Sequence, residues 1–280
     1  MTLDKADSDR YATIDGVELH YNDVGAGPAL MTFHGGGPGA NAWDNTRFNV
    51  PELSKHFRML LVDLPGYGGS DKSATLPEGK TVDGFLARLM RGLLDHLGIE
   101  TTHLYCSSFS GPFGVRFGLD YPERIGKLVL QATYASTGMP LMLSPTPAEG
   151  IKTLMEFREE PTYERMQRMM DYFIPNPALR SKELVDRRFA AATISGHLEA
   201  AARFGGSANM SNVQREAANL KTETLLLWGG QDWMVPVEGV LRAMGEIPNL
   251  RVHIWRGAGH FVQYEHRDEF NRLVLDFLTH

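Results

Sequence analysis

Short apolar runs alternate with amphipathic helical patterns along most of the chain, and this alternation constrains the fold more than any other feature. Apolar runs of strand length lie at residues 29–33, 58–62, 103–105, 127–130, 224–228 and 251–254. Helical spacing of apolar residues occurs at 82–97, where Thr81 is a candidate N-cap, and again at 237–244 and 266–278. Buried, mostly apolar strands that alternate with helices predict a mostly parallel sheet with helices on both faces, an α/β fold.

Two segments depart from this alternation. Residues 11–14 and 17–21 flank Asp15-Gly16, which predicts an antiparallel hairpin. Residues 135–220 show no convincing strand and are typical of several helices. We therefore expect an α/β core formed by residues 1–134 and 221–280, with a helical cap at 135–220 over the carboxyl edge of the sheet. The many methionines of the cap are expected to fill its interior, or alternatively to line an apolar pocket.

Composition excludes several classes of partner. The 280 residues carry a net charge of −6 without a run of Lys and Arg, which argues against nucleic acid and anionic membranes. Cys106 is the single cysteine, so no internal disulfide is expected. The polar N-terminus and the lack of a long apolar stretch favour a cytoplasmic protein. The histidines are scattered without a ligand-like pair, and we expect neither a metal nor another cofactor.

A cluster of serines follows the strand predicted at 103–105, in the stretch Cys106-Ser-Ser-Phe-Ser110. A strand, a sharp turn and a helix form the context in which a Gly-x-Ser-x-Gly elbow exposes a nucleophilic serine. Ser108 occupies the nucleophile position of such an elbow, and Cys106 and Ser110 occupy its glycine positions. Because both glycines are missing, a turn whose hydroxyls only cap the next helix is equally compatible with these residues.

Two later loops supply the partners that a serine nucleophile requires. A serine hydroxyl needs a base, and the base needs an acid that holds it in the right tautomer. Asp232 follows the strand predicted at 224–228, and His260 follows the one at 251–254. The order Ser, Asp, His and the positions after late strands are those of α/β-hydrolases. Either residue alone is an ordinary loop residue, but together they predict a triad of Ser108, His260 and Asp232.

The loop after the strand at 29–33 is rich in glycine and reads His34-Gly-Gly-Gly-Pro-Gly-Ala40. We expect the backbone amide of Gly36 or Gly37, with that of Phe109, to form an oxyanion hole, in which each donor contributes about 2.7–4 kcal/mol. The same glycines, with Asp63 ending the next strand, also fit a dinucleotide fingerprint. Pro38 and the lack of an obvious helix directly after the loop argue against that alternative.

The chain resembles the meta-cleavage-product hydrolases, which cleave carbon–carbon bonds in bacterial degradation of aromatic and steroid rings. The resemblance covers nearly the whole length. The segments that carry it are His34-Gly-Gly-Gly-Pro-Gly-Ala40, Tyr121-Pro-Glu-Arg-Ile-Gly-Lys-Leu128, Pro147-Ala-Glu-Gly-Ile-Lys152, Gly259-His260 and Glu265-His-Arg-Asp-Glu-Phe-Asn-Arg-Leu273. It implies that the protein is a homo-oligomer. It also implies that the protein binds a small-molecule substrate. That substrate is a vinylogous 1,5-diketone such as a 2-hydroxy-6-oxohexa-2,4-dienoate, hydrolysed to a 2-hydroxydienoate and a carboxylic acid. By the same resemblance, we expect the enol to become a ketone first, Ser108 then to attack C6, and water to release the acyl group.

The resemblance also implies substrate-binding roles. Arg188 matches the arginine that holds the carboxylate and oxo oxygens of the substrate, a task suited to a planar guanidinium, although Arg187 competes for the assignment. Asn45 matches a polar residue of the dienoate pocket. Phe261 replaces the tryptophan that usually follows the histidine. Ser107 is at the position where the usual elbow, Gly-Asn-Ser-Met-Gly-Gly, has asparagine. This departure affects the identity of the substrate more than the identity of the nucleophile.

Three other functions are compatible with the sequence. An esterase or lactonase would use the same triad and would not need Arg188. A non-catalytic module that binds a small ligand would have lost activity at the altered elbow, but it would have no reason to keep Asp232 and His260. A cofactor-independent oxygenase or haloperoxidase on the same fold would consume oxygen or peroxide during turnover.

Overall fold

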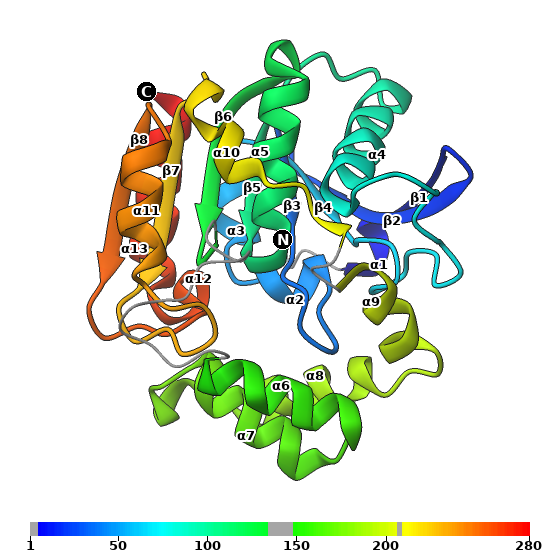
Figure 1. Ribbon diagram of the computed structural model, residues 1–280, viewed down its shortest axis with the longest axis vertical. Coiled ribbons are helices and arrows are strands. Elements are labelled where there is room, and N and C mark those ends of the chain that lie inside the picture. The colour runs from blue at the N-terminus through cyan, green and yellow to red at the C-terminus, as the bar shows by residue number, and fades with distance from the viewer. Residues whose placement is uncertain (1–4, 134–147, 206–208) are drawn as a thin grey trace.

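The computed structural model describes residues 5–133, 148–205 and 209–280 of the chain. Within them, an eight-stranded sheet has the order β1-β2-β4-β3-β5-β6-β7-β8 (Figure 1). The strands are β1 (Asp9–Ile14), β2 (Val17–Val24), β3 (Ala29–Phe33), β4 (Arg58–Val62), β5 (Thr102–Ser107), β6 (Ile125–Gln131), β7 (Thr224–Gly229) and β8 (Leu250–Trp255). β2 pairs antiparallel with β1 and β4, and all other pairs are parallel. The predicted mostly parallel sheet is therefore confirmed.

Helices cover both faces of the sheet. On one face lie α4 (Val82–His96), α5 (Gly111–Asp120) and α11 (Gly239–Glu246), and on the other lie α2 (Ala42–Thr46), α3 (Val50–Leu53), α12 (Val262–Glu265) and α13 (Arg267–Thr279). The short helix α1 (Lys5–Ser8) precedes the first strand. Each face has its own buried apolar cluster, as the apolar strands require. None of the helices in the described part of the chain is long and apolar enough to span a bilayer.

Local sequence signals explain several of these boundaries. Asp15 and Gly16 have φ angles of 52° and 81°, the left-handed geometry that a two-residue hairpin turn between β1 and β2 requires. Thr81 begins α4, because its side chain accepts the N–H of Gly84 at 3.3 Å. The predicted hairpin and the predicted cap of this helix are both confirmed.

One local expectation was wrong. A helix, α2, does begin directly after the glycine-rich loop, at Ala42. It is a single turn, too short to show helical periodicity, and Asn41 caps it by accepting the N–H of Asp44 at 2.8 Å. Asp63, the candidate ribose ligand, is buried, and its carboxylate is already engaged by the N–H of Ala42 and by Nδ1 of His20, both at 2.7 Å.

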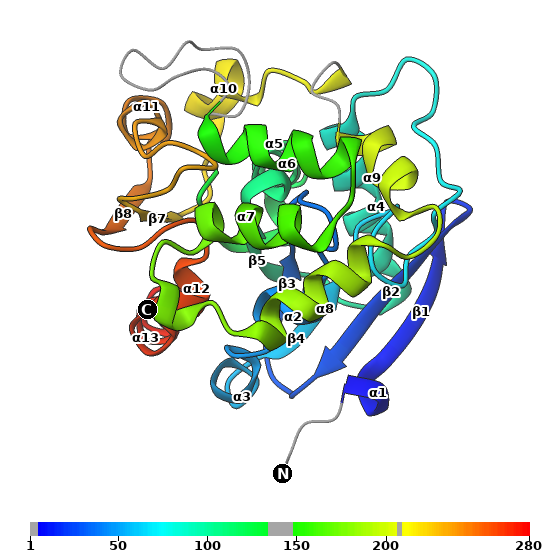
Figure 2. The ribbon, with the colours of Figure 1, turned by 90° about the horizontal axis from the view of Figure 1, so that it is seen from below.

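Four helices lie across the carboxyl ends of the strands, and Figure 2 shows them in front of the sheet. These cap helices are α6 (Glu149–Glu159), α7 (Tyr163–Phe173), α8 (Lys182–Ala192) and α9 (His197–Gly205). Met166, Met169 and Met170 are fully buried in an apolar cluster that joins the cap helices to Met234 and Phe261 of the core, as expected for an interior filled by methionine. Met139 and Met142 lie outside the described residues. The short α10 (Val213–Glu216), by contrast, contacts α5 of the core.

Candidate active site

Ser108 lies in a strained turn between β5 and α5. Its φ angle is +53°, in the left-handed region that residues other than glycine rarely adopt. Helix α5 lies close to β5 at this point, because a Cβ atom on Gly114 of the helix would lie 2.7 Å from Sγ of Cys106 on the strand. Position 106 must therefore carry a small side chain. Ser110 fits the turn because its hydroxyl donates to the carbonyl of Ser107 at 2.9 Å. The backbone therefore has the geometry expected of an elbow, although neither glycine is present.

Asp232 and His260 form a buried pair at the ends of β7 and β8. Nδ1 of His260 lies 2.7 Å from Oδ2 of Asp232, and the two side chains are 3% and 0% exposed. The other carboxylate oxygen accepts the backbone N–H groups of Met234 and Val235 at 2.8 and 2.9 Å. These contacts fix the carboxylate, and a proton on Nδ1 of His260 leaves Nε2 free to act as a base.

The glycine-rich loop runs directly beside Ser108 and Phe109. A Cβ atom on Gly35 would lie 3.2 Å from Cβ of Ser108, and one on Gly36 would lie 2.8 Å from the ring of Phe109. The carbonyl of Gly36 accepts the hydroxyl of Tyr67 at 2.9 Å. This close approach excludes larger residues from the loop and brings its backbone to the elbow. The assignment of Gly36, Gly37 and Phe109 as oxyanion donors stays a prediction.

Two buried histidines that the sequence reasoning did not single out support this loop. Nε2 of His34 accepts the N–H of Leu64 at 3.0 Å, and Nε2 of His197, in cap helix α9, accepts the N–H of Gly39 at 3.0 Å. Burial lowers the pKa of both imidazoles, that of His197 to about 4, so both act as neutral acceptors. The partners of these two Nε2 atoms come from distant segments, so no local pattern signals the two bonds.

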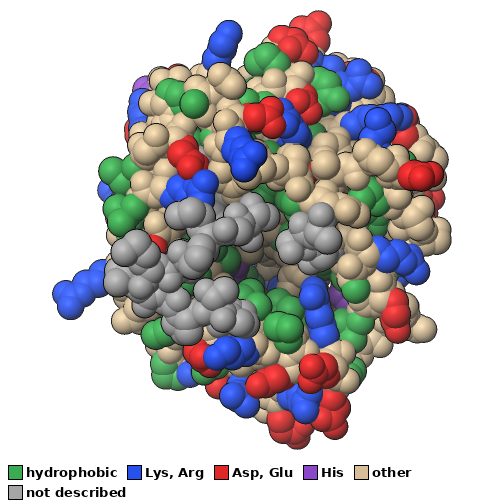
Figure 3. Space-filling view, in the orientation of Figure 1, with side chains coloured by type: hydrophobic (Ala, Val, Ile, Leu, Met, Phe, Trp, Pro, Cys, Tyr) green, Lys and Arg blue, Asp and Glu red, His purple; other side chains and the backbone are tan. Residues whose placement is uncertain are grey.

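A cavity of about 490 Å³ lies between the sheet and the cap helices, and Figure 3 shows the surface hollowed above the cap. Its lining includes Ser108, His260, Asn45, Arg188 and Phe261. The rest of the lining is formed by Gly35, Gly36, Gly37, Phe109, Ala132, Thr133, Ile151, Leu154, Met155, Arg158, Phe173, Met210, Met234 and Val235. Methionine side chains therefore line the pocket as well as fill the interior of the cap. The volume is that of a small-molecule site.

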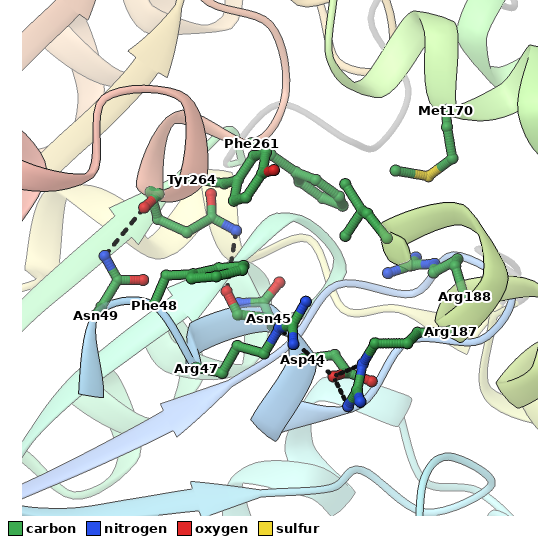
Figure 4. A pocket seen from close by; sticks show the side chains of 12 residues that line it. Asp44, Asn45, Arg47, Phe48, Asn49, Met170, Arg187, Arg188, Phe261 and Tyr264 are labelled. Carbon is green, nitrogen blue, oxygen red and sulfur yellow. Dashed lines mark hydrogen bonds and ion pairs between the residues drawn. The ribbon is translucent and has the colours of Figure 1, made fainter. Parts of the chain in front are cut away.

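The two neighbouring arginines of α8 have different surroundings (Figure 4). Nε of Arg187 lies 2.9 Å from the carboxylate of Asp44, and the two form an ion pair. Arg188 is directed into the cavity, where its guanidinium carbon lies 5.5 Å from the ring centre of Phe173 and 5.7 Å from that of Phe261. Burial lowers the pKa of Arg188 to about 10, so it is still charged at neutral pH. Of the two candidates, Arg188 is the one that faces the cavity.

Several buried polar atoms near the cavity have no hydrogen-bond partner among the described residues. They include Nε of Arg188, Nδ2 of Asn45 and Oγ of Ser107. An unpaired buried polar group costs about 1–3 kcal/mol, so donors at the cavity wall are suited to a polar ligand. Ser107 is 1% exposed and does not line the cavity, and its contact with substrate stays a prediction. In the described part of the chain, no group of three or more His, Cys, Asp or Glu is placed to hold a metal ion.

Comparison with known proteins places these features in context. A model of the alpha/beta hydrolase family matches residues 30–273. The 2-hydroxy-6-oxononadienedioate/2-hydroxy-6-oxononatrienedioate hydrolase of Burkholderia vietnamiensis is 37% identical over 94% of this chain and 92% of its own length. The 2-hydroxy-6-oxo-6-phenylhexa-2,4-dienoate hydrolase of Burkholderia cepacia is 34% identical over 99% of this chain and 98% of its own.

The same relationship is present in three dimensions. The solved structure of the meta-cleavage product hydrolase of Pseudomonas fluorescens IP01 superposes with a TM-score of 0.83. It is 28% identical in sequence, and the match covers 96% of each chain.

Proposed function

The chain belongs to the alpha/beta hydrolase family and, within it, to the meta-cleavage product hydrolases, and we propose that it cleaves a carbon–carbon bond of a 2-hydroxy-6-oxohexa-2,4-dienoate. The observation that carries this proposal is the presence, in one cavity, of Ser108 in its strained turn and of the guanidinium of Arg188, whose Nε is buried without a partner among the described residues. An ester hydrolase needs a serine of this kind, but it has no use for a buried cation. A dienoate has a carboxylate and an adjacent oxygen that a guanidinium binds with two parallel hydrogen bonds.

Substrate binding uses the polar side of the cavity. Arg188 holds the carboxylate and the oxygen at C2, Nδ2 of Asn45 donates to the same end, and Phe261 forms an apolar wall. In this position the 2-hydroxyl loses its proton and C5 gains one, which converts the dienol to a ketone. The C5 carbon is then saturated and lies next to the C6 carbonyl. The positive charge of Arg188 stabilises the negative charge that develops on the C2 oxygen.

The triad then performs the cleavage. His260 takes the proton of the Ser108 hydroxyl as Oγ bonds to C6, and the C6 oxygen becomes an oxyanion that the amides of Gly36 or Gly37 and Phe109 bind. When the oxyanion collapses, the C5–C6 bond breaks and its electron pair moves toward the C2 carbonyl. His260 returns the proton to that fragment, which leaves as the 2-hydroxydienoate. Water, activated by His260, then attacks the acyl–Ser108 ester and releases a carboxylic acid.

The test follows the strong absorbance of the dienol in the visible or near ultraviolet. Wild-type protein is mixed with 2-hydroxy-6-oxo-6-phenylhexa-2,4-dienoate and, separately, with 2-hydroxy-6-oxonona-2,4-dienedioate, and each is repeated with Ser108→Ala. We expect bleaching by the wild type that is lost in the variant, where only the slower shift to the ketone remains. Labelling of Ser108 by a fluorophosphonate with turnover of aryl esters but of neither dienoate would replace this proposal with an esterase.

We further propose that the protein is a cytoplasmic homo-oligomer. A single buried cysteine requires no oxidising compartment. Leu241 and Met244, on the outer side of α11, are 73% and 62% exposed, and apolar side chains grouped on a surface are typical of subunit contacts. Light scattering of the purified chain measures the oligomeric state directly, and a monomer at micromolar concentration would contradict the proposal.

A further inference from the structure

The cavity is lined by two guanidinium groups and by no carboxylate among the described residues. Arg188 accounts for one of the two cations, but Arg158, in cap helix α6, also lines the cavity and has no role in the mechanism above. The stretches outside the described residues at 134–147 and 206–208 contain no Asp, Glu, Lys or Arg, so they add no charge of either sign. The cavity therefore has more positive charge than one carboxylate neutralises.

Arg158 belongs to the face of α6 that lines the cavity. Ile151, Leu154 and Met155 precede it by seven, four and three positions, the spacing of residues that share one side of a helix, and all three line the same cavity. The side chain of Arg158 therefore lies at the end of an apolar strip. This arrangement suits a substituent that is apolar near the reacting carbon and charged at its tip.

Arg158, like Arg188, has no counter-ion among the described residues, whereas the other basic residues of α6 and α7 do. No hydrogen bond or ion pair joins it to any described residue, whereas Lys152 pairs with Glu149, Arg165 with Glu160 and Arg168 with Glu156. Arg158 is half-buried at the cavity wall, so its charge is available to an anionic group of a ligand in the cavity.

The charges of both arginines reach the same part of the site. Burial raises the pKa of the Tyr67 hydroxyl to about 12, and the positive charges of Arg158 and Arg188 oppose that rise. The charges of both guanidinium groups are therefore felt at Tyr67, whose hydroxyl donates to the carbonyl of Gly36 in the glycine-rich loop. A substrate that spans this region with a carboxylate at each end satisfies both.

We propose that Arg158 binds a second carboxylate, carried at the tip of the C6 substituent, and that this enzyme therefore acts on dicarboxylates. The inference rests on the proposed function and narrows its substrate class. The names of the two Burkholderia relatives mark the alternatives: a nonadienedioate ends its C6 substituent in a carboxylate, and a 6-phenylhexadienoate ends it in a phenyl ring. Arg188 binds the first carboxylate, and Arg158 binds the second, so the enzyme prefers the dienedioate to a substrate without a second carboxylate.

The test compares two substrates that differ only in the second carboxylate, 2-hydroxy-6-oxonona-2,4-dienedioate and 2-hydroxy-6-oxonona-2,4-dienoate. Their kcat/KM values are measured for wild type, Arg158→Gln and Arg168→Gln, and their Kd values by absorbance titration of the same three proteins with Ser108→Ala added. Arg168→Gln is the matched control, because Arg168 is a cap arginine that is 60% exposed and does not line the cavity. We expect Arg158→Gln to weaken binding and turnover of the dioate by about tenfold to a hundredfold, the usual effect of losing a charged hydrogen bond, and to leave the monoacid unchanged.

Each outcome separates the inference from the proposed function. Wild-type cleavage of both substrates without a preference, or an equal loss for both in Arg158→Gln, would overturn the role of Arg158 and leave the carbon–carbon hydrolase intact. Absence of cleavage in the wild type, with tighter binding of the dioate that depends on Arg158, would overturn the reaction but support the second carboxylate site. A preference for the dioate that survives in Arg168→Gln and disappears in Arg158→Gln supports both.

Discussion

The backbone N–H of Gly39 donates a hydrogen bond to Nε2 of His197, 3.0 Å away, and this bond joins the glycine-rich loop to cap helix α9. Gly39 has a φ angle of +70°, and a Cβ atom at this position would collide with the carbonyl of Arg188. The loop is thus packed against two cap helices at one residue. Its geometry beside Ser108 therefore depends on the cap as well as on the core.

His197 makes stability depend on pH on the acid side. Burial lowers its pKa from 6.5 to about 4, so between these values the unfolded chain binds a proton that the folded chain does not. Stability is therefore lost as the pH falls from about 6.5 to 4, by about 1–3 kcal/mol for this group. We expect urea unfolding of His197→Gln, which keeps an acceptor for Gly39, to show a shallower loss over the same range. An identical slope in both proteins would mean that His197 does not titrate in this way.

The variant Asp232→Asn keeps the hydrogen bonds that position residue 232 but changes the tautomer of His260. The side-chain oxygen that remains still accepts the N–H groups of Met234 and Val235, but the new amide nitrogen faces Nδ1 of His260 and favours the wrong tautomer. We expect kcat to fall by about 10³–10⁴-fold with little change in the melting temperature. Stopped-flow absorbance gives the rate, and circular dichroism gives the melting temperature. A rate within about tenfold of wild type would remove Asp232 from the triad.

The neighbours Arg187 and Arg188 offer a matched pair of variants. Arg188→Gln removes the cavity cation, and we expect kcat/KM for any dienoate to fall by about a hundredfold or more. Arg187→Gln removes only a partly exposed ion pair with Asp44, so we expect a loss of stability below about 1 kcal/mol and nearly unchanged kinetics. Steady-state kinetics and urea unfolding on both variants make the comparison. Equal kinetic losses would contradict the assignment.

Glu265 gives a pH effect of the opposite sign. Burial, with the negative charge of Asp232 adding to it, raises its pKa to about 7, while its Oε1 accepts the N–H of Gly259 at 2.8 Å. Between about 4.5 and 7 the folded chain holds the extra proton, so stability falls as the pH rises through this window. Glu265→Gln keeps the acceptor without the charge. We therefore expect the free energy of unfolding of Glu265→Gln, minus that of wild type, to be about 1–2 kcal/mol larger at pH 8 than at pH 4.

Unfolding free energies at several pH values measure this difference. Asp268→Asn is the control, because Asp268 is a carboxylate of the next helix whose side chain is 90% exposed. A difference between Glu265→Gln and wild type that does not change with pH would show that Glu265 ionises at its ordinary pKa.

Much of the core was predictable because its determinants are local. Strands β3 and β4 have the predicted bounds, 29–33 and 58–62, since a strand covered on both faces of the sheet is mostly apolar. Thr81 signals the start of α4 because an N-cap acts within its own first turn. The strand ends also located Ser108, Asp232 and His260, because in a parallel sheet the loops after the strands meet at one edge.

The tertiary structure decided what depends on segments far apart in the chain. Adjacent residues of a helix point about 100° apart, so only the packing of α8 assigned Arg187 to Asp44 and Arg188 to the cavity. The bond between Gly39 and His197 and the place of Arg158 in the cavity depend likewise on how the cap lies over the sheet. The sequence by itself determined the mostly parallel sheet and the order Ser108, Asp232, His260 along the chain. The left-handed turn that identifies the elbow at Ser108 became apparent only in the structure. The docking of the cap determined which charges face the substrate, because burial and partners are set by contacts that no local pattern encodes.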